Sequence, residues 1–387
     1  MDSKLSNFVM IMAERISGTD HIEIYPVAGE SFGVRGFCFK ICTPDLSIIL
    51  DPGCSLGPRK DQKIPHPFEF KKLYQLTDLI IHESKRCSHV FISHFHHDHF
   101  KPNIEDNFLI HSNNSIFSSI YTGKTIFTKN HQNKINYNQK ERALKFFRDL
   151  RKIECTHRSI ADNFGELTIR EDFVKIYSEL VKNNIINDTF AIGKTIFIFP
   201  KEYLHGERKD RRKFYVQPLI IIYCSEVFYY FPDVQGIAND IDFHNLMKIK
   251  IDINRTINQT IDPNLNVINV IAVGGMRDFN QNSHEHTKKI IEKFDISIID
   301  HHLMRSKLFF EIWSDYHEVS RIKGGCVRSM NSNLHPNEKG MNEINLEKMV
   351  MECFRSEMYE QFPPSKSFKK WLDFNQREKK AEKSTSH

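Results

Sequence analysis

Short apolar runs separated by polar turns fill most of the first 300 residues, and this pattern predicts a mixed α/β protein. Strands are expected at residues 22–27, 37–41, 47–50, 88–92, 116–127, 189–200, 216–224, 227–231, 266–273 and 296–299. Apolar residues spaced three or four positions apart predict helices at residues 68–84, 139–153, 171–183 and 307–322. Strands interleaved with helices in this way are typical of the α/β (α+β) class.

The composition is that of a globular protein, with 40% hydrophobic and 27% charged residues among 387. No stretch reaches the roughly 20 apolar residues that a membrane span needs, and the apolar run at residues 8–13 is too short for a signal peptide. Eight cysteines are scattered without a C-x-x-C pair, which favours reduced thiols. We therefore expect a cytoplasmic protein without membrane association. Its net charge of +5 does not by itself indicate a nucleic-acid partner.

Histidine and aspartate are concentrated in residues 93–99, directly after the apolar strand at residues 88–92. His94 and His96 lie two positions apart, so in an extended chain both rings point to one side and can share a metal ion. Asp98 and His99 follow where the strand should give way to a loop, which suits a second ion nearby. An exposed histidine-rich loop is the alternative, but four His and one Asp in six positions favour a metal site.

Several motifs resemble those of the metallo-β-lactamase superfamily, whose signature is H-x-H-x-D-H after a strand. They lie at residues 29–35, 50–53, 56–58, 94–99, 231–236 and 300–303. Within the superfamily, the chain resembles a mainly archaeal family of uncharacterised predicted hydrolases, over about residues 21–330. The resemblance implies a four-layer αββα sandwich. We expect a hydrolase domain at residues 21–330 with an insertion at about residues 155–187. An N-terminal extension at residues 1–20 would precede it, and a helical, basic C-terminal extension at residues 331–387 would follow it.

The resemblance also implies further metal ligands at the ends of later strands. His205 matches the third histidine of the first ion, with a plain loop histidine as the alternative. Asp233 follows the strand at residues 227–231, where a carboxylate bridging two ions belongs; an Asp that caps a turn would look the same. His301 has Arg305 four residues later, as in ribonuclease Z-like members, and is assigned to the second ion. His302 is the alternative ligand.

Two residues near the predicted ligands are given supporting roles. Asp51 matches a superfamily aspartate that braces the metal loop by hydrogen bonding, although an Asp before Pro also forms turns. His302 would protonate the leaving alkoxide, and Asp98 would accept the proton of the attacking water. The implied cofactor is a pair of divalent ions, with Zn²⁺ expected first and Mn²⁺ or Fe as alternatives.

The substrate prediction depends on a run of cations that follows His205 and is expected at the rim of the site. Its members are Arg208, Lys209, Arg211, Arg212 and Lys213. They would suit a phosphodiester, in a nucleic acid or a nucleotide, whereas a solvated charged loop is the plain alternative. The sequence thus predicts a two-metal phosphodiesterase or nuclease. A hydrolase of a lactone, thioester or other acyl bond and a non-catalytic binding module are the other hypotheses.

Overall fold

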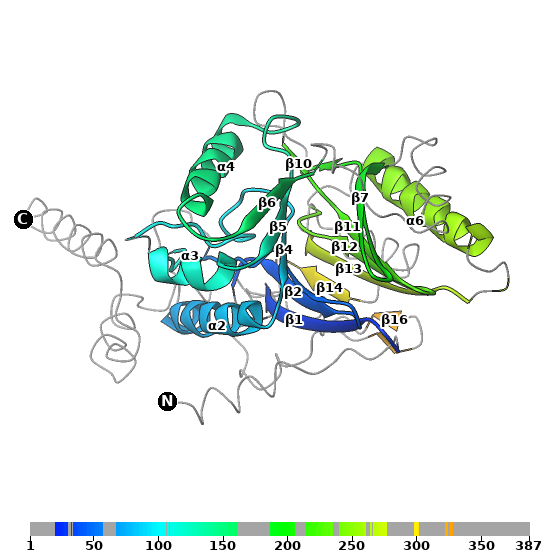
Figure 1. The fold of residues 1–387 in the computed structure, drawn as a ribbon, viewed down its shortest axis with the longest axis horizontal. Coiled ribbons are helices and arrows are strands. Elements are labelled where there is room, and N and C mark those ends of the chain that lie inside the picture. Colours follow the sequence, from blue (N-terminus) through cyan, green and yellow to red (C-terminus); the bar gives the residue numbers. More distant parts are fainter. Residues whose placement is uncertain are drawn as a thin grey trace, which may run out of the picture.

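The structure is a computed structural model of the chain (Figure 1). It describes residues 20–29, 32, 34–56, 67–105, 107, 109–160, 186–205, 214–234, 240–260, 264, 266–276, 298–301, 322–323 and 326–327. The described residues form two six-stranded β-sheets and two short two-stranded ones. The two large sheets share an apolar core, and helices pack against their other faces.

The first sheet is built from the first half of the chain, and its strands lie side by side in chain order. They are β1 (Glu23–Gly29), β2 (Phe37–Cys42), β3 (Ser47–Leu50), β4 (His89–Ile92), β5 (Thr125–Thr128) and β6 (Thr156–Ser159). Pairing is antiparallel from β1 to β3 and parallel from β3 to β6. The parallel strands are joined by α2 (Pro67–Lys85), α3 (Asn114–Tyr121) and α4 (Tyr137–Leu150), because a parallel connection needs a crossover.

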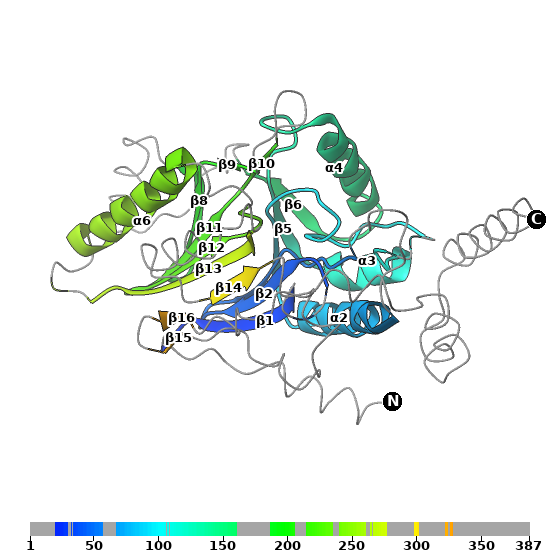
Figure 2. The same ribbon diagram turned by 180° about the vertical axis from the view of Figure 1, so that it is seen from behind.

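The second sheet comes from the second half of the chain and is seen from behind in Figure 2. Its order is β14 (Ile298–His301), β13 (Ile268–Met276), β12 (Glu226–Phe231), β11 (Leu219–Tyr223), β8 (Thr195–Pro200) and β7 (Ile186–Ile192). The helix α6 (Asp240–Thr260) joins the parallel strands β12 and β13. The short pairs are β9 (Tyr203–Leu204) with β10 (Tyr215–Val216), and β15 (Ile322–Lys323) with β16 (Cys326–Val327).

Aromatic side chains fill the space between the two large sheets. Successive residues of a strand point to opposite faces, so Phe228 and Tyr230 of β12 face the first sheet while their neighbours face away. The ring of Tyr230 stacks on Phe37 of β2, with ring centroids 5.2 Å apart. Eight of the 31 Phe residues in the sequence belong to this sheet-on-sheet cluster.

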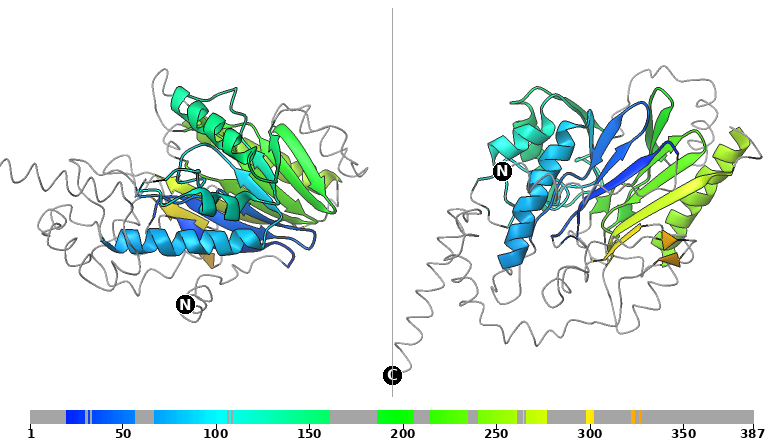
Figure 3. Two further views of the ribbon diagram at one scale, coloured as in Figure 1. Left: turned by 60° about the vertical axis from the view of Figure 1, so that its left-hand side comes forward. Right: turned by 90° about the horizontal axis from the view of Figure 1, so that it is seen from below.

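Helices cover the outer face of each sheet. Leu73, Leu76 and Ile80 of α2 pack in one cluster with Val90 and Ile92 of β4. On the other side, α6 contributes Ile249, Ile253 and Ile257, spaced four apart, to a cluster with alternate residues of β11 and β12. Figure 1 and the right-hand view of Figure 3 show α2 and α6 on opposite sides of the sheet pair.

The predicted mixed α/β class is confirmed, but two local predictions differ from the structure. Residues 116–127 were expected to be strand, whereas α3 occupies residues 114–121 and only β5 is extended. The Asn113 side chain caps this helix by accepting a hydrogen bond from the Ile116 backbone N–H, and that capping signal outweighs the β-branched residues. The helix α6 was not predicted, although its buried isoleucines recur with helical spacing.

Several predicted segments lie outside the described residues. They are the helices at 171–183 and 307–322 apart from residue 322, nearly all of the N-terminal extension, and the whole C-terminal extension. Of the predicted insertion, residues 161–185 are also outside, while its edges form β6 and the start of β7. Among the described helices, none combines the length and the apolar character required to cross a membrane.

The isoleucines of α6 allow a matched test of the packing on the second sheet. Ile253 is fully buried, whereas Ile251, two positions earlier, is 47% exposed. Ile253→Ala should lower the free energy of unfolding by about 2–4 kcal/mol, because it removes buried methyl groups and leaves a cavity. Ile251→Ala should change it by less than about 1 kcal/mol. Urea denaturation of both variants measures the difference, and equal losses would contradict the assigned face of α6.

Candidate metal centre

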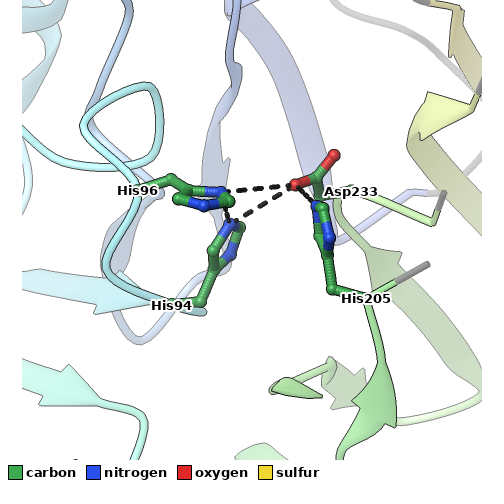
Figure 4. A group of neighbouring side chains, drawn as sticks. All are labelled: His94, His96, His205 and Asp233. Atoms are coloured by element: carbon green, nitrogen blue, oxygen red, sulfur yellow. Dashed lines mark hydrogen bonds and ion pairs between the residues drawn. The ribbon is translucent and has the colours of Figure 1, made fainter. Parts of the chain in front are cut away.

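Four side chains converge where the ends of β4, β9 and β12 meet (Figure 4). These residues are His94, His96, His205 and Asp233, and each offers a ligand atom within 4.8 Å of the others. His94 Nε2 lies 3.0 Å from His96 Nδ1 and 3.4 Å from Asp233 Oδ2. Asp233 Oδ2 is 3.7 Å from His96 Nδ1 and contacts His205 Nε2 directly. The donor atoms therefore point at one small volume.

The ligand-bearing residues sit just beyond strand ends, where the chain leaves the regular hydrogen-bond ladder. His94 and His96 follow β4 of the first sheet, His205 follows β9, and Asp233 follows β12 of the second sheet. Asp233 adopts a φ of +52°, a left-handed conformation that most residues avoid and that Asp tolerates. This bend turns its carboxylate toward the histidines, and the Val234 N–H bonds to the Gly274 carbonyl oxygen.

Burial keeps two of these histidines neutral. Desolvation holds the pKa of His94 well below its ordinary value, with a further contribution from the nearby His99. Desolvation also lowers the pKa of His96 to about 4. Neutral imidazole offers a nitrogen lone pair, which is the form that binds a metal ion.

Asp51 lies just after β3, and its fully buried carboxylate forms hydrogen bonds with residues next to this site. Its Oδ1 accepts a hydrogen bond of 2.7 Å from the Ser93 N–H. Its Oδ2 accepts bonds from the Ser93 hydroxyl at 2.6 Å, from His99 Nδ1 at 2.7 Å and from the Tyr230 hydroxyl at 3.0 Å. The carboxylate thereby links the metal loop, the first sheet and β12 of the second sheet.

These hydrogen bonds fix which ring nitrogens carry protons. Because a carboxylate only accepts hydrogen bonds, His99 Nδ1 must carry a proton. Burial alone would lower the pKa of His99, but the charge and hydrogen bond of Asp51 outweigh it and raise this pKa to about 9. The Ser93 hydroxyl donates to Asp51 and therefore accepts from His94 Nδ1, at 3.0 Å. The Nε2 lone pair of His94 is then directed at the cluster, as metal ligation requires.

Asp51 also lies within reach of His94 and His99 in a second grouping that has the size of a metal site. Its oxygens, however, already accept the bonds from Ser93, His99 and Tyr230, and such a carboxylate has little capacity left for an ion. The contacts of Asp51 are therefore those of hydrogen-bonding support, and its role toward a bound metal stays a prediction.

Phe214 forms an apolar wall beside the histidines, and sequence reasoning missed it. Its buried ring stacks on His205 with centroids 4.2 Å apart and lies 4.8 Å from the His96 ring. The His205 N–H also bonds to the Phe214 carbonyl oxygen, at 3.0 Å. Tyr230 was missed as well. The only sequence signal for Tyr230 is its place on the inward face of an otherwise apolar strand.

Asp98 and His99 lie beside the four-residue cluster rather than within it. Asp98 Oδ2 is 3.3 Å from the Arg35 guanidinium, and its side chain is 8% exposed. Burial opposes ionisation of Asp98, but Arg35 and then His99 outweigh it and hold its pKa well below the usual range. Asp98 is therefore an ionised carboxylate, and it is close enough to His96 and Asp233 to interact with their charges.

A glycine allows the metal loop to pack closely against the end of β3. A Cβ atom on Gly53 would lie 2.1 Å from the Phe100 backbone nitrogen and 2.5 Å from the His99 carbonyl carbon. No side chain can be accommodated at that distance. The motif Leu50-Asp51-Pro52-Gly53 thus supplies both the supporting carboxylate and the space for the chain that follows His99.

A buried ion pair holds the segment that carries His205. Glu202, three residues before it, lies 3.0 Å from Lys129 Nζ and 3.1 Å from Lys134 Nζ. Lys129 follows β5 of the first sheet, and its N–H bonds to the Ile92 carbonyl oxygen at the end of β4. The ion pair between Lys129 and Glu202 therefore links the end of β4, which precedes His94, to the segment that carries His205.

The remaining predicted site residues are not placed by the structure. His301 ends β14, but its side chain is outside the described part of the chain, as are His302 and Arg305. The cation run at residues 208–213 also lies outside. Assignment of His301 to a second ion, and of the cation run to substrate binding, therefore stays a prediction.

The residues that are present fit a divalent metal ion. Three imidazole nitrogens and one carboxylate oxygen form a donor set that suits Zn²⁺, Mn²⁺ and iron. Two of the rings are neutral, and His94 is oriented through Ser93 by a buried carboxylate, as is usual for metal-binding histidines. The four side chains thus have the donor atoms and the spacing to hold one divalent ion.

Sequence comparison finds archaeal relatives along most of the chain. A UPF0282 protein of Methanocaldococcus jannaschii is 28% identical over 316 residues, covering 78% of this chain and 92% of its own length. That of Saccharolobus solfataricus is 28% identical over 342 residues, covering 88% and 94%. The chain is similar to archaeal UPF0282 proteins. This agrees with the archaeal resemblance expected from the motifs, while no protein-family model matches the sequence.

Comparison with solved structures gives weak overlaps. CmlA, a diiron beta-hydroxylase from Streptomyces venezuelae, overlaps 67% of this chain and 35% of its own, with a TM-score of 0.31 and 12% identity. Unliganded yeast PDE1 overlaps 66% of this chain and 75% of its own, with a TM-score of 0.33 and 13% identity. Because these TM-scores are low, the description of the fold depends on the strand order and packing given above and not on these overlaps.

Removal of the Asp51 charge should weaken metal binding without a change of ligand. In Asp51→Asn one oxygen becomes an N–H₂ group that cannot accept hydrogen bonds from Ser93 and His99. The His99 ring then loses its partner, and the His94 ring loses the orientation that it receives through Ser93. We expect metal affinity to fall about 10–100-fold, as for other outer partners of metal ligands. A zinc competition titration with a chromogenic chelator measures this.

The matched control is Asp45→Asn, in the turn at the opposite end of β3. Asp45 Oδ2 also accepts backbone hydrogen bonds, from Lys194 at 2.7 Å and Thr195 at 2.9 Å, but it lies away from the cluster. This variant should lose stability while keeping its metal affinity. Unchanged affinity in Asp51→Asn would show that the carboxylate does not support the site.

The ion pair of Glu202 predicts a pH dependence of stability. Burial opposes ionisation, but Lys129 and other partners lower the pKa of Glu202 from 4.5 to about 2. Since the folded-state pKa is depressed, the contribution is present above pH 4.5 and is lost as pH falls toward 2. The shift corresponds to about 3 kcal/mol.

Glu202→Gln should therefore be about 3 kcal/mol less stable than the unaltered protein at pH 7 and nearly equal to it close to pH 2. Denaturant unfolding at a series of pH values tests this. Glu154→Gln, at an exposed position, provides the control and should track the unaltered protein throughout. A constant difference for Glu202→Gln at all pH values would refute the assigned ion pair.

Proposed function

We propose that the protein is a metal-dependent hydrolase of the metallo-β-lactamase type that uses two divalent ions on a phosphodiester. The observation that carries the proposal is the convergence of His94, His96, His205 and Asp233 within 4.8 Å. His94 and His96 lie more than a hundred positions before His205 and Asp233, so their meeting is not a by-product of a local histidine-rich loop.

The packing of the two sheets supports the finer fold assignment in this proposal. Helices on the outer faces and strands facing one another correspond to a four-layer αββα sandwich, with the candidate site at one end of both sheets. Placing the ligands after strand ends is consistent with a metallo-β-lactamase type of fold. The similarity to archaeal UPF0282 proteins does not indicate an activity, because the names of those proteins state none.

The proposed division of labour uses this chain's own residues. His94, His96 and His205 would hold the first ion, and Asp98, His301 and the neutral form of His99 the second, with Asp233 shared. Bound ions of this kind activate water and stabilise the negative charge that develops on the oxygens of an ester. His302 would protonate the leaving alkoxide, and Asp98 would accept the proton of the attacking water.

Positive charge around the site supports a phosphodiester as the substrate. Arg35 pairs with Asp98, and the cation run at residues 208–213 begins three residues after His205. Guanidinium groups bind phosphate oxygens through paired, charge-assisted hydrogen bonds. The buried wall formed by Phe214 supplies a low-dielectric side on which such contacts gain strength.

The test is to measure metal content and turnover of the purified protein beside His96→Ala. We expect about two ions per chain and metal-dependent cleavage of bis-p-nitrophenyl phosphate. Loss of this ligand should reduce turnover by more than the roughly 10–100-fold that loss of an outer partner costs. His82→Ala alters a histidine on α2 that is 49% exposed, and it should behave as the unaltered protein.

Three results would contradict the proposal in different ways. Turnover of lactones or thioesters without any phosphodiester cleavage would make the protein an acyl hydrolase. Two bound ions without turnover of either class would favour a binding module. Failure to take up metal under conditions that load other zinc enzymes would refute the assigned metal centre.

A further inference from the structure

Two arginines from separate elements flank Asp98 at the edge of the candidate metal centre. Arg35 Nη2 lies 3.3 Å from Asp98 Oδ2, and its side chain is 22% exposed. Arg142 of α4 is half-buried and is close enough to Asp98 for their charges to interact. Asp98 itself interacts with His96, His99 and Asp233. Arg35 thus contacts a carboxylate beside the ligand cluster, and Arg142 reaches the backbone of the same loop at Phe95.

Both arginines are held by the backbone around them. The Arg35 N–H donates to the Ser55 carbonyl oxygen at 2.8 Å, and the Ser55 N–H returns a bond of 3.0 Å to Arg35. The next residue, Gly36, packs so closely on Gly53 that a Cβ atom would lie 2.7 Å from the Gly53 carbonyl oxygen. Arg142 Nη1 donates to the Phe95 carbonyl oxygen, inside the metal motif, at 3.5 Å.

The local charge balance favours an anionic ligand here. Arg35 contacts Asp98 directly, Arg142 is within electrostatic reach of it, and Lys145, one turn further along α4, is within electrostatic reach of His97. Asp98 and Asp233 offer two negative charges against these three cations. Arginine is also better suited than lysine to an oxyanion, because its planar fork can bind two oxygens at once.

We infer that Arg35 and Arg142 form an oxyanion-binding site that takes the non-bridging oxygens of a phosphoryl group beside the metal centre. This inference deepens the proposed function, since it assigns the part of a phosphodiester that these residues hold. A phosphoryl group is preferred to a carboxylate because it has more oxygens to share between two guanidinium groups.

The experiment measures binding of inorganic phosphate to the metal-loaded protein by isothermal titration calorimetry, so it does not depend on turnover. Arg35→Met and Arg142→Met should each weaken phosphate binding about tenfold or more, because each removes a charge-assisted contact. Arg148→Met, at an exposed position on the same helix as Arg142, is the matched control and should leave phosphate binding unchanged. Metal content is determined for every variant.

Each outcome has one meaning. Weaker phosphate binding in both variants with full metal content supports the inference, even if no phosphodiester is turned over. Unchanged phosphate binding in both variants overturns it, even if phosphodiester cleavage is observed. Loss of a metal ion in Arg35→Met assigns that arginine to holding Asp98 and also overturns it. Acetate that binds as tightly as phosphate, with the same dependence on both arginines, would replace the phosphoryl group by a carboxylate.

Discussion

The interaction on which the rest of the site depends is the buried Asp51 carboxylate. An ionised carboxylate without exposure is costly unless donors surround it, and here Ser93, His99 and Tyr230 provide them. Each donor belongs to a different part of the site: the start of the metal loop, its end, and the second sheet. One side chain thereby fixes the shape of the loop, the proton positions on two histidines and the spacing of the sheets.

The site is bordered by an apolar side chain on one side and by a buried ion pair on another. Phe214 excludes water on one side, while Lys129 and Glu202 form an ion pair whose side chains are only 1% and 6% exposed. Removing one member of such a pair would leave the other as an uncompensated buried charge, which costs far more stability than the loss of a surface contact. The histidines are thus held in a frame with few alternative arrangements, which is what a binding site needs to be ready before its ligand arrives.

Much of the architecture and part of the site could be predicted from the sequence, for identifiable reasons. Strands such as β4 and β12 are short apolar runs with turn signals, and His94 and His96 are two positions apart in the sequence and close in space. His205 and Asp233 needed a family resemblance, because no local pattern says which strand ends meet. Tyr230 and Phe214 were beyond reach, since an aromatic residue in an apolar segment looks like core until its neighbours across the fold are known.

The ligand cluster is divided equally between the two halves of the chain. His94 and His96 come from the half that forms the first sheet, and His205 and Asp233 from the half that forms the second. Neither half alone offers more than two of these four donors, so the complete set forms only when both halves have been synthesised and have docked. A chain that ends before Asp233 lacks one donor, whatever the state of its first sheet.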